Sequence, residues 1–434
     1  MNRNRVNKKR MGGARVLSRA AAGMLAAALC FQPMTALAGP AGDSSLTSSS
    51  SNAGPGGGSV SSNSGSTGSS GGSTSVSNGG VSAVTSGLGV YRVTENEGIG
   101  AIARGVDVSY WQQNVNWSQV ASDNVQFAML ATRFRGNVDP FFAMNAANAS
   151  QAGLRLGAYI YSYATSVEMA QQEADFVLNL IKDYPISFPV VFDAEDANTL
   201  GTLTQSQVSD VINAFCKRIQ DAGYYPMVYA NEYWIANKID MSKISYDIWV
   251  AKYQQKYTYS KTSMWQASNT GSVKGVNGNV DIDYLYKDYT QIIPGNTWRT
   301  IAGNRYYYQN HVMQKSAWIN DGQNWYYMNA AGNPSTGWLE LSGKKYYLEA
   351  DGHMITGWKT LDGGWRYFDA SGEQATGWRA VDGSWYFMAD NGLMQTGWLE
   401  TGGKKYYLNA SGAMQAGWQN LGGSWYYFDG SGAM

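Results

Sequence analysis

The chain has 434 residues, too many for one ordinary domain and enough for two or three. Its formal net charge is zero, and its two histidines, His311 and His353, both lie in the last third of the sequence. The preceding residues therefore contain no base for a Ser-His-Asp or Cys-His hydrolase, and no ligands for a His-rich zinc site. Any catalysis there must rest on carboxylates, amides and phenols.

Residues 1–38 have the pattern of a secretory signal peptide. Seven basic residues precede an apolar run at 20–31, and the small-residue site Ala36-Leu37-Ala38 follows. The run is shorter than the roughly 20 residues of a membrane-spanning helix, so we expect secretion without stable membrane insertion, with a retained anchor as the alternative. Cleavage removes seven basic and no acidic residues from a chain of net charge zero, which leaves −7. That charge argues against nucleic acid as a partner.

A flexible linker is predicted for residues 39–100. Up to about Gly89 this stretch is nearly all Ser, Gly, Asn, Thr and other small residues. Such a composition cannot bury enough apolar surface to fold by itself.

Residues 101–292 alternate short β-rich runs with helical patterns, which predicts a parallel α/β arrangement. We expect an incomplete β/α barrel of about eight strands and five helices, because the last gaps between strands show no apolar period. The strands are predicted at 105–108, 127–133, 156–163, 189–195, 226–230, 248–253, 263–267 and 280–284. The helices are predicted at 117–123, 141–152, 167–182, 205–222 and 233–239, and Thr204 with Gln207 resembles a capping box before the fourth.

Residues 293–434 repeat with a period of 20. Tryptophans recur at this spacing from Trp298 onward: Trp318, Trp338, Trp358, Trp378, Trp398 and Trp418. A second aromatic cluster follows each of them by seven to nine residues, and Gly pairs such as Gly402-Gly403 fall where a hairpin must turn. Because one unit is too small to bury its own aromatic face, neighbouring units must stack into a β-hairpin solenoid.

A strand that ends in acids is the strongest catalytic signal. The run from Pro189 to Asp196 is apolar until Asp193, and Asp193 and Glu195 share one strand face. Two carboxyl groups on one wall of a barrel are costly in a core, and their like charges raise one proton affinity, as a general acid requires. Asp107 and Asp281 lie in the first and last strands, which are neighbours in a closed barrel, so we expect them in the same catalytic set.

Aromatic and amide side chains at other strand ends predict a sugar-binding cleft around these acids. The expected substrate-binding residues are Tyr110, Tyr161, Tyr163, Tyr229, Asn231, Trp265, Gln266 and Asp283. An acidic cluster can also hold calcium or magnesium, but no EF-hand loop is present, so we expect no metal and no cofactor.

These residues resemble the glycoside hydrolase family 25 muramidases, the Chalaropsis-type lysozymes. The resemblance runs from about Gly105 to Tyr284 and includes Gly105-Val106-Asp107, Pro189 to Asp196, and Trp265-Gln266. It implies an incomplete (β/α) barrel that cleaves the β-1,4 bond from N-acetylmuramic acid to N-acetylglucosamine. Asp283 departs from the family, which often has Asn at that position.

The resemblance also implies roles for the acids. Carried over by position, Glu195 is the general acid/base, Asp193 its partner, and Asp107 and Asp281 the remaining acids. Two-carboxylate hydrolysis can retain or invert the anomeric configuration. We favour a third route, in which the substrate's own 2-acetamido group attacks the anomeric carbon.

The C-terminal repeats resemble the choline-binding, or cell-wall-binding, repeats of Gram-positive surface proteins. The resemblance implies cation–π cages built from the Gly-Trp tryptophan, an aromatic from the second cluster, and often a methionine such as Met394 or Met414. The second cluster begins with Arg305, Lys345 and Lys405 in three units. A cation in the cage wall repels choline, so we expect fewer than seven sites, near Trp325, Trp365, Trp385 and Trp425.

The sequence therefore predicts a secreted, wall-associated peptidoglycan hydrolase with glycan strands as substrate and choline or another wall-polymer group as the ligand of the repeats. The alternative is a non-catalytic cell-wall or glycan-binding surface protein. A third hypothesis is a glycosidase that acts on another polymer, such as chitin.

Overall fold

The computed structural model describes residues 74–78, 81–93, 98–253 and 255–434. The predicted signal peptide and most of the predicted linker lie outside these residues. Among the helices that are described, none has both the length and the apolar character needed to cross a bilayer.

The end of the predicted linker forms a small antiparallel sheet. Strands β1 (Thr74–Asn78), β2 (Val81–Ser86) and β3 (Gly89–Val93) pair in sequence order. Tyr91 is 1% exposed and belongs to the core of the following domain, and Arg92 exchanges two hydrogen bonds with Asn124. The expectation of a linker up to residue 100 is corrected here: valines and Tyr91 supply apolar surface that the average Ser/Gly composition conceals.

Eight strands form a closed barrel in the order β10-β11-β12-β13-β4-β5-β8-β9. Their bounds are β4 Ala103–Val108, β5 Phe127–Ala131, β8 Arg155–Tyr161, β9 Ile186–Asp193, β10 Pro226–Asn231, β11 Asp247–Ala251, β12 Thr262–Gly271 and β13 Val280–Leu285. Five helices accompany them: α1 Trp117–Ser122, α2 Phe142–Gln151, α3 Val167–Ile181, α4 Gln205–Asp221 and α5 Glu232–Asn237. The predicted barrel of eight strands and five helices is confirmed.

One strand corrects the prediction of a parallel barrel. Strand β13 runs antiparallel to both of its neighbours, β12 and β4, whereas the other pairs are parallel. The connection from β12 to β13 spans residues 272–279 and contains no helix. Parallel strands need a longer crossover, so this short connection returns the chain in the opposite direction.

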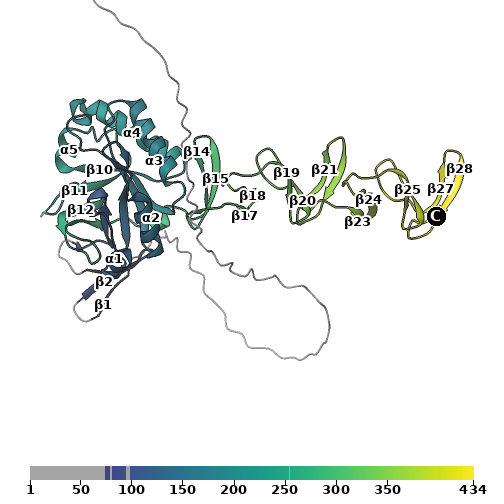
Figure 1. The fold of residues 1–434 in the computed structure, drawn as a ribbon, viewed down its shortest axis with the longest axis horizontal. Helices are drawn as coiled ribbons and strands as arrows, with labels where there is room; N and C mark the ends of the chain where they lie inside the picture. The colour runs from purple at the N-terminus through teal and green to yellow at the C-terminus, as the bar shows by residue number, and fades with distance from the viewer. Residues whose placement is uncertain (1–73, 79–80, 94–97, 254) are drawn as a thin grey trace, which may run out of the picture. The chain divides into compact units, whose positions relative to one another are not determined.

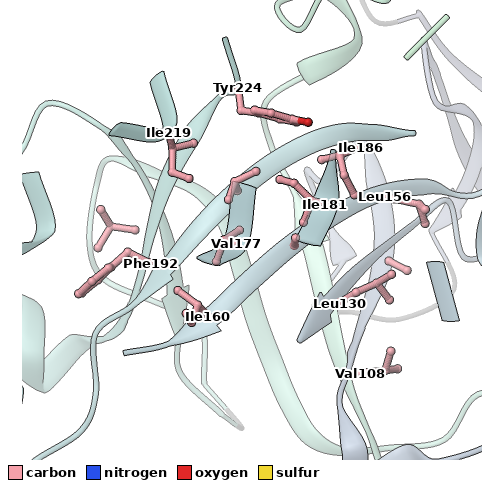
Figure 2. Packing of buried hydrophobic residues seen from close by; sticks show 14 of the residues in the cluster. Val108, Leu130, Leu156, Ile160, Val177, Ile181, Ile186, Phe192, Ile219 and Tyr224 are labelled. Carbon is pink, nitrogen blue, oxygen red and sulfur yellow. The ribbon is translucent and has the colours of Figure 1, made fainter. Parts of the chain in front are cut away.

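The barrel strands are apolar on both faces because each face packs against a different layer. Outward side chains such as Leu130, Ile160 and Phe192 belong to one buried cluster with Val177 and Ile181 of α3 (Figure 2). Inward side chains such as Phe127, Met129 and Met227 fill the barrel interior as a second cluster. Since alternate residues of a strand face opposite sides, this pattern decides which side chains reach the pocket described below.

The remaining strands are short antiparallel hairpins, which confirms the predicted hairpin solenoid. Most pair only within their own hairpin, and β16 adds a third strand to the first. The bounds are β14 Thr297–Ile301, β15 Asn304–Gln309, β16 Val312–Met313, β17 Ala317–Asn320, β18 Trp325–Met328, β19 Gly337–Leu341, β20 Lys344–Leu348, β21 Gly357–Leu361, β22 Gly364–Phe368, β23 Gly377–Val381, β24 Ser384–Met388, β25 Gly397–Thr401, β26 Lys404–Leu408, β27 Gly417–Leu421 and β28 Ser424–Phe428. Positive φ angles at turn pairs such as Gly402-Gly403 match the tight turn that favours glycine.

Backbone hydrogen bonds connect several of the hairpins to a segment that follows the next hairpin. The N–H of Met394 donates to the carbonyl of Trp365 at 2.8 Å, and the N–H of Met414 donates to Trp385 at 2.8 Å. Trp358 also lies 4.8 Å, between ring centroids, from Tyr386 of the next hairpin. Stacked aromatic rings and single backbone hydrogen bonds therefore hold the hairpins together in place of a continuous sheet.

Helix α4 begins at the predicted capping box. The Thr204 hydroxyl accepts a hydrogen bond from the Gln207 backbone N–H at 3.3 Å, and the Gln207 side chain accepts one from the Thr204 N–H at 3.0 Å. Helix α4 packs beside α3 (Figure 1), so its start helps to hold the outer layer of the barrel.

We predict that Thr204→Ala lowers the free energy of unfolding of the barrel by about 1 kcal/mol, because the substitution leaves N-terminal N–H groups of α4 without an acceptor. Urea unfolding followed by far-ultraviolet circular dichroism measures the change. Thr204→Ser keeps the hydroxyl and is the matched control, expected to lie within about 0.5 kcal/mol of the wild type. Equal losses in both variants would contradict the capping role.

Candidate active site

A pocket of about 410 Å³ opens at the carboxyl ends of the parallel barrel strands. It is lined by acids, phenols, indoles and two arginines from all eight barrel strands and from the segments that follow them. The lining residues are Asp107, Ser109, Trp111, Ala131, Arg133, Phe134, Arg135, Tyr159, Tyr161, Tyr163, Asp193, Glu195, Tyr229, Trp249, Tyr253, Gln266 and Asp281. All four predicted catalytic acids are therefore in one pocket.

Asp193 and Glu195 come from a single strand end. Asp193 is the last residue of β9 and is 5% exposed, and Glu195 lies two residues beyond it. The Asp193 Oδ1 atom is buried and has no hydrogen-bond partner among the described residues. A buried acceptor without a donor is costly, so this atom is suited to receive a hydrogen bond from a bound molecule.

Gln266 connects the other two acids to the aromatic wall. Its Nε2 donates to Asp107 Oδ2 at 2.7 Å and to Asp281 Oδ2 at 3.4 Å. Its Oε1 accepts from the hydroxyls of Tyr229 and Tyr253, each at 2.8 Å. The two phenols fix the orientation of the amide, which therefore points its donors at the carboxylates.

Burial is the main cause of the raised pKa values of the four acids in this pocket. It raises the pKa of Glu195, and the neighbouring Asp281 and Asp196 raise it further. Burial raises the pKa of Asp281 to about 6. The pKa values of Asp107 and Asp193 are raised by burial and then by the acids beside them, Asp281 and Glu195 respectively. The pocket thus favours protonated carboxyl groups, as a general acid at neutral pH requires.

Half of the predicted substrate-binding residues line the pocket. Tyr161, Tyr163, Tyr229 and Gln266 do so, and the Tyr161 hydroxyl donates to Asp196 at 3.1 Å. Tyr161, Tyr229 and Gln266 lie on the inward face of their strands, and Tyr163 follows the end of β8.

The other four do not line the pocket, for local reasons. Trp265 precedes inward-facing Gln266, so it faces outward and donates to the Lys252 carbonyl at 2.9 Å. Asn231 caps α5. Asp283 is fully buried one step below the pocket, where it accepts from Trp249 Nε1 at 3.0 Å. The Tyr110 ring stacks on Phe134 at 4.0 Å behind the lining.

Sequence reasoning missed several lining residues. Tyr159, Trp249 and Tyr253 also line the pocket, and strand alternation from Tyr161, two residues along β8, could have pointed to Tyr159. The alternation of side chains along a strand gives no signal for residues that follow the end of a barrel strand. This applies to Trp111, Arg133, Phe134 and Arg135.

Family models match both parts of the chain. The model of glycosyl hydrolases family 25 matches residues 106–276. Choline-binding repeat models match 335–376 and 375–416, and a putative cell wall binding repeat model matches 316–333 and 416–434.

Curated relatives align with the same region. YegX of Escherichia coli (strain K12) is 31% identical over 189 residues, which are 41% of this chain and 68% of YegX. The chain belongs to glycosyl hydrolase family 25. Lysozyme M1 of Streptomyces globisporus is 30% identical over 195 residues, covering 41% of this chain and 66% of that protein.

Two solved structures are similar to parts of this chain. Choline binding protein F from Streptococcus pneumoniae, crystallised in the presence of a peptidoglycan analogue, is 32% identical with a TM-score of 0.31. That match covers 39% of this chain and 63% of choline binding protein F. The endolysin from phage Cp-1, complexed with choline, is 23% identical with a TM-score of 0.35, over 72% of this chain and 94% of the endolysin.

Three stacked hairpin pairs of this family 25 hydrolase bring together the residue types of an aromatic cage. Each combines a tryptophan of the 20-residue register, the tryptophan seven residues later, a tyrosine of the next hairpin and a methionine. The sets are Trp318, Trp325, Tyr346 and Met354; Trp358, Trp365, Tyr386 and Met394; and Trp378, Trp385, Tyr406 and Met414. The third set lines a cavity of about 330 Å³.

At two other positions an arginine of the chain lies over the tryptophan ring. The Arg305 guanidinium carbon lies 4.1 Å from the centroid of the Trp298 ring, and that of Arg366 lies 5.0 Å from Trp338. Around Trp398, Lys405 replaces the second tryptophan and lies 4.0 Å from Glu400. For Trp418 and Trp425, the described residues supply no tyrosine from a following hairpin.

The raised pKa of Asp281 makes barrel stability depend on pH. The folded protein holds this proton to about pH 6, whereas an unfolded chain releases it near 3.8, so stability is lost as the pH rises from about 4 through 6. We predict that Asp281→Asn, which cannot ionise, raises the free energy of unfolding at pH 7 by about 1–3 kcal/mol and leaves it nearly unchanged at pH 4.

Urea unfolding at pH 4 and pH 7 measures this difference. Asp390→Asn, at an exposed position in the repeats, is the control and should change stability at neither pH. A variant that is less stable than the wild type at pH 7 would show that Asp281 is stabilised as a carboxylate.

Proposed function

We propose that the barrel hydrolyses the β-1,4 bond between N-acetylmuramic acid and N-acetylglucosamine in peptidoglycan, after secretion of the protein to the cell wall. The observation that carries the proposal is the pair Asp193 and Glu195 in an aromatic-lined pocket, with the pKa of Glu195 raised by burial. Family 25 membership supports it, as do the names of relatives such as lysozyme M1 and the autolytic lysozyme of Clostridium acetobutylicum.

In the proposed mechanism, Glu195 is the general acid. It donates its proton to the glycosidic oxygen while the bond from that oxygen to the anomeric carbon breaks. The carbonyl oxygen of the substrate's 2-acetamido group forms a bond to the same carbon, and a cyclic oxazolinium intermediate results. Water, losing a proton to Glu195, then attacks the anomeric carbon and reopens the ring.

Asp193 is proposed to orient the acetamido group. Its buried Oδ1 lacks a donor among the described residues, and the acetamido N–H is a donor that becomes more acidic as positive charge develops on the ring. Asp107, Asp281 and Gln266 form the opposite, hydrogen-bonded wall. A stable covalent sugar adduct on Asp193 would exclude this route and favour the two-carboxylate retaining mechanism.

We predict that Glu195→Gln lowers the rate of peptidoglycan digestion by at least about 100-fold, because glutamine keeps the shape of the side chain but carries no transferable proton. Mass spectrometry of the released sugars identifies the bond: the wild type should release muropeptides with N-acetylmuramic acid at the reducing end. Glu168→Gln, on the exposed start of α3, is the matched control and should digest at the wild-type rate.

Two outcomes would contradict the assignment. Release of reducing-end N-acetylglucosamine would place the cut at the other glycosidic bond. Failure of the wild type to cut any wall would favour the alternative, a non-catalytic wall-binding protein.

The repeats are proposed to bind choline groups of a wall polymer. A quaternary ammonium group is attracted to aromatic faces and needs no hydrogen bond, and the three aromatic sets with a methionine offer such faces. The guanidinium groups of Arg305 and Arg366 lie over the rings that ammonium groups would contact, so their like charge disfavours choline at those positions.

We predict that one chain binds three equivalents of choline and that Trp385→Ala reduces this number to two. Isothermal titration with choline chloride measures the stoichiometry. Lys345→Ala changes the equivalent position at the site where Arg366 lies over Trp338 and should leave three. A loss of one equivalent in both variants, or of none in Trp385→Ala, would contradict the cage assignment.

A further inference from the structure

A two-residue hairpin forms one wall of the active-site pocket. Strands β6 (Arg133–Phe134) and β7 (Asn137–Val138) pair around a turn at Arg135 and Gly136. The base of the hairpin is closed by the Asp139 N–H, which donates to the Thr132 carbonyl at 3.1 Å. Because the hairpin is short and closed at its base, it fixes the two arginines that line the pocket.

The hairpin is also attached to the segment that follows the first barrel strand. Asp139 is 2% exposed, and its Oδ2 accepts from the Tyr110 backbone N–H at 2.7 Å. The Phe134 ring stacks on Tyr110 with an interplanar angle of 15° and meets the Trp111 ring edge-on at 5.7 Å. This wall is therefore built before any substrate binds.

Arg133 is held in place by a buried acid. Its Nη1 donates to Glu173 Oε1 at 2.5 Å, and Glu173 also accepts from the Ser162 hydroxyl at 2.6 Å and the Tyr163 N–H at 3.0 Å. Glu173 is 5% exposed, so water screens its carboxylate little and the carboxylate pairs with Arg133. The Arg133 Nε atom is buried without a partner among the described residues.

Arg135 differs from Arg133 in having no carboxylate to neutralise it. The side chain is exposed on the pocket wall, its guanidinium carbon lies 5.1 Å from the Phe134 ring centroid, and within the described residues no acid lies at ion-pair distance. Its φ of 48°, followed by 81° at Gly136, is the left-handed conformation in which Asn or Gly is usual. A bulky cation thus occupies a turn position that local preference would give to a smaller residue.

The pocket therefore has an acidic end and a cationic end. The four acids lie on or next to β4, β9 and β13. The cationic end lies on the hairpin. A neutral sugar chain offers an unpaired guanidinium only uncharged acceptors, whereas a carboxylate beside the scissile bond binds it through stronger, charge-assisted hydrogen bonds.

We propose that Arg135, with Arg133 behind it, binds a carboxylate of the peptide stem carried by N-acetylmuramic acid. The proposal rests on the proposed function and names the part of the substrate that sets specificity. It gives the enzyme a preference for stem-bearing glycan over the same glycan without stems.

The test uses soluble peptidoglycan tetrasaccharides with stem peptides, and the same tetrasaccharides after an amidase has removed the stems. The stripped form keeps the carboxylate of the lactyl group, so the two substrates distinguish the two sources of carboxylate. The preference is the ratio of kcat/KM on the stem-bearing substrate to kcat/KM on the stripped one. We expect Arg135→Gln to lower this ratio about fivefold through KM, and Arg135→Lys to keep most of it.

Lys217→Gln removes an exposed cation from α4 and is the matched control, with an unchanged ratio. An unchanged ratio in Arg135→Gln, or equal losses on both substrates, would overturn the proposal, and a loss confined to the stripped glycan would assign Arg135 to the lactyl carboxylate instead. Titration of both tetrasaccharides into Glu195→Gln with and without Arg135→Gln measures the same preference as binding. That readout separates failure of this proposal from failure of the proposed catalysis.

Discussion

The active site depends on how strand β13 closes the barrel. This strand pairs antiparallel with β4, and the register sets Asp281 directly opposite Asp107. The opposite direction of β13 also places Asp281 near the start of its strand, whereas Asp107 and Asp193 lie at the ends of theirs. Three acids from distant parts of the sequence consequently reach the same rim. In an open sheet the first and last strands would be edges, and these carboxyl groups would not meet.

Closing the barrel creates an electrostatic cost, which one amide partly relieves. Carboxyl groups buried near one another resist ionisation, and Gln266 offsets this for Asp107 and Asp281 by donating to both. Tyr229 and Tyr253 hold the amide in that orientation. The same burial that destabilises the carboxylates keeps a proton available on Glu195, so the cost in stability and the capacity for acid catalysis have one physical cause.

The hairpin solenoid uses its tryptophans both to hold the structure together and to form cages. A Gly-Trp ring such as Trp358 packs edge-on against tyrosines of its own and the next hairpin, which keeps successive units together. The second tryptophan of a cage remains about half exposed, as Trp365 and Trp385 are. Stacking therefore needs the first ring, and only the cage needs the second. This division explains how Lys345 can replace a tryptophan without loss of the hairpin.

The sequence by itself determined the parts that depend on local patterns. Strand and helix positions, the capping box at Thr204, the period of 20 residues and the acids at the end of β9 all follow from composition and spacing. The tertiary structure alone decided the direction of β13, the burial of Asp283 below the pocket, and the outward position of Trp265 beside inward Gln266. These features depend on register and on which face of a strand meets the barrel interior. Spacing along the chain cannot specify them, because a shift of one residue reverses every side chain.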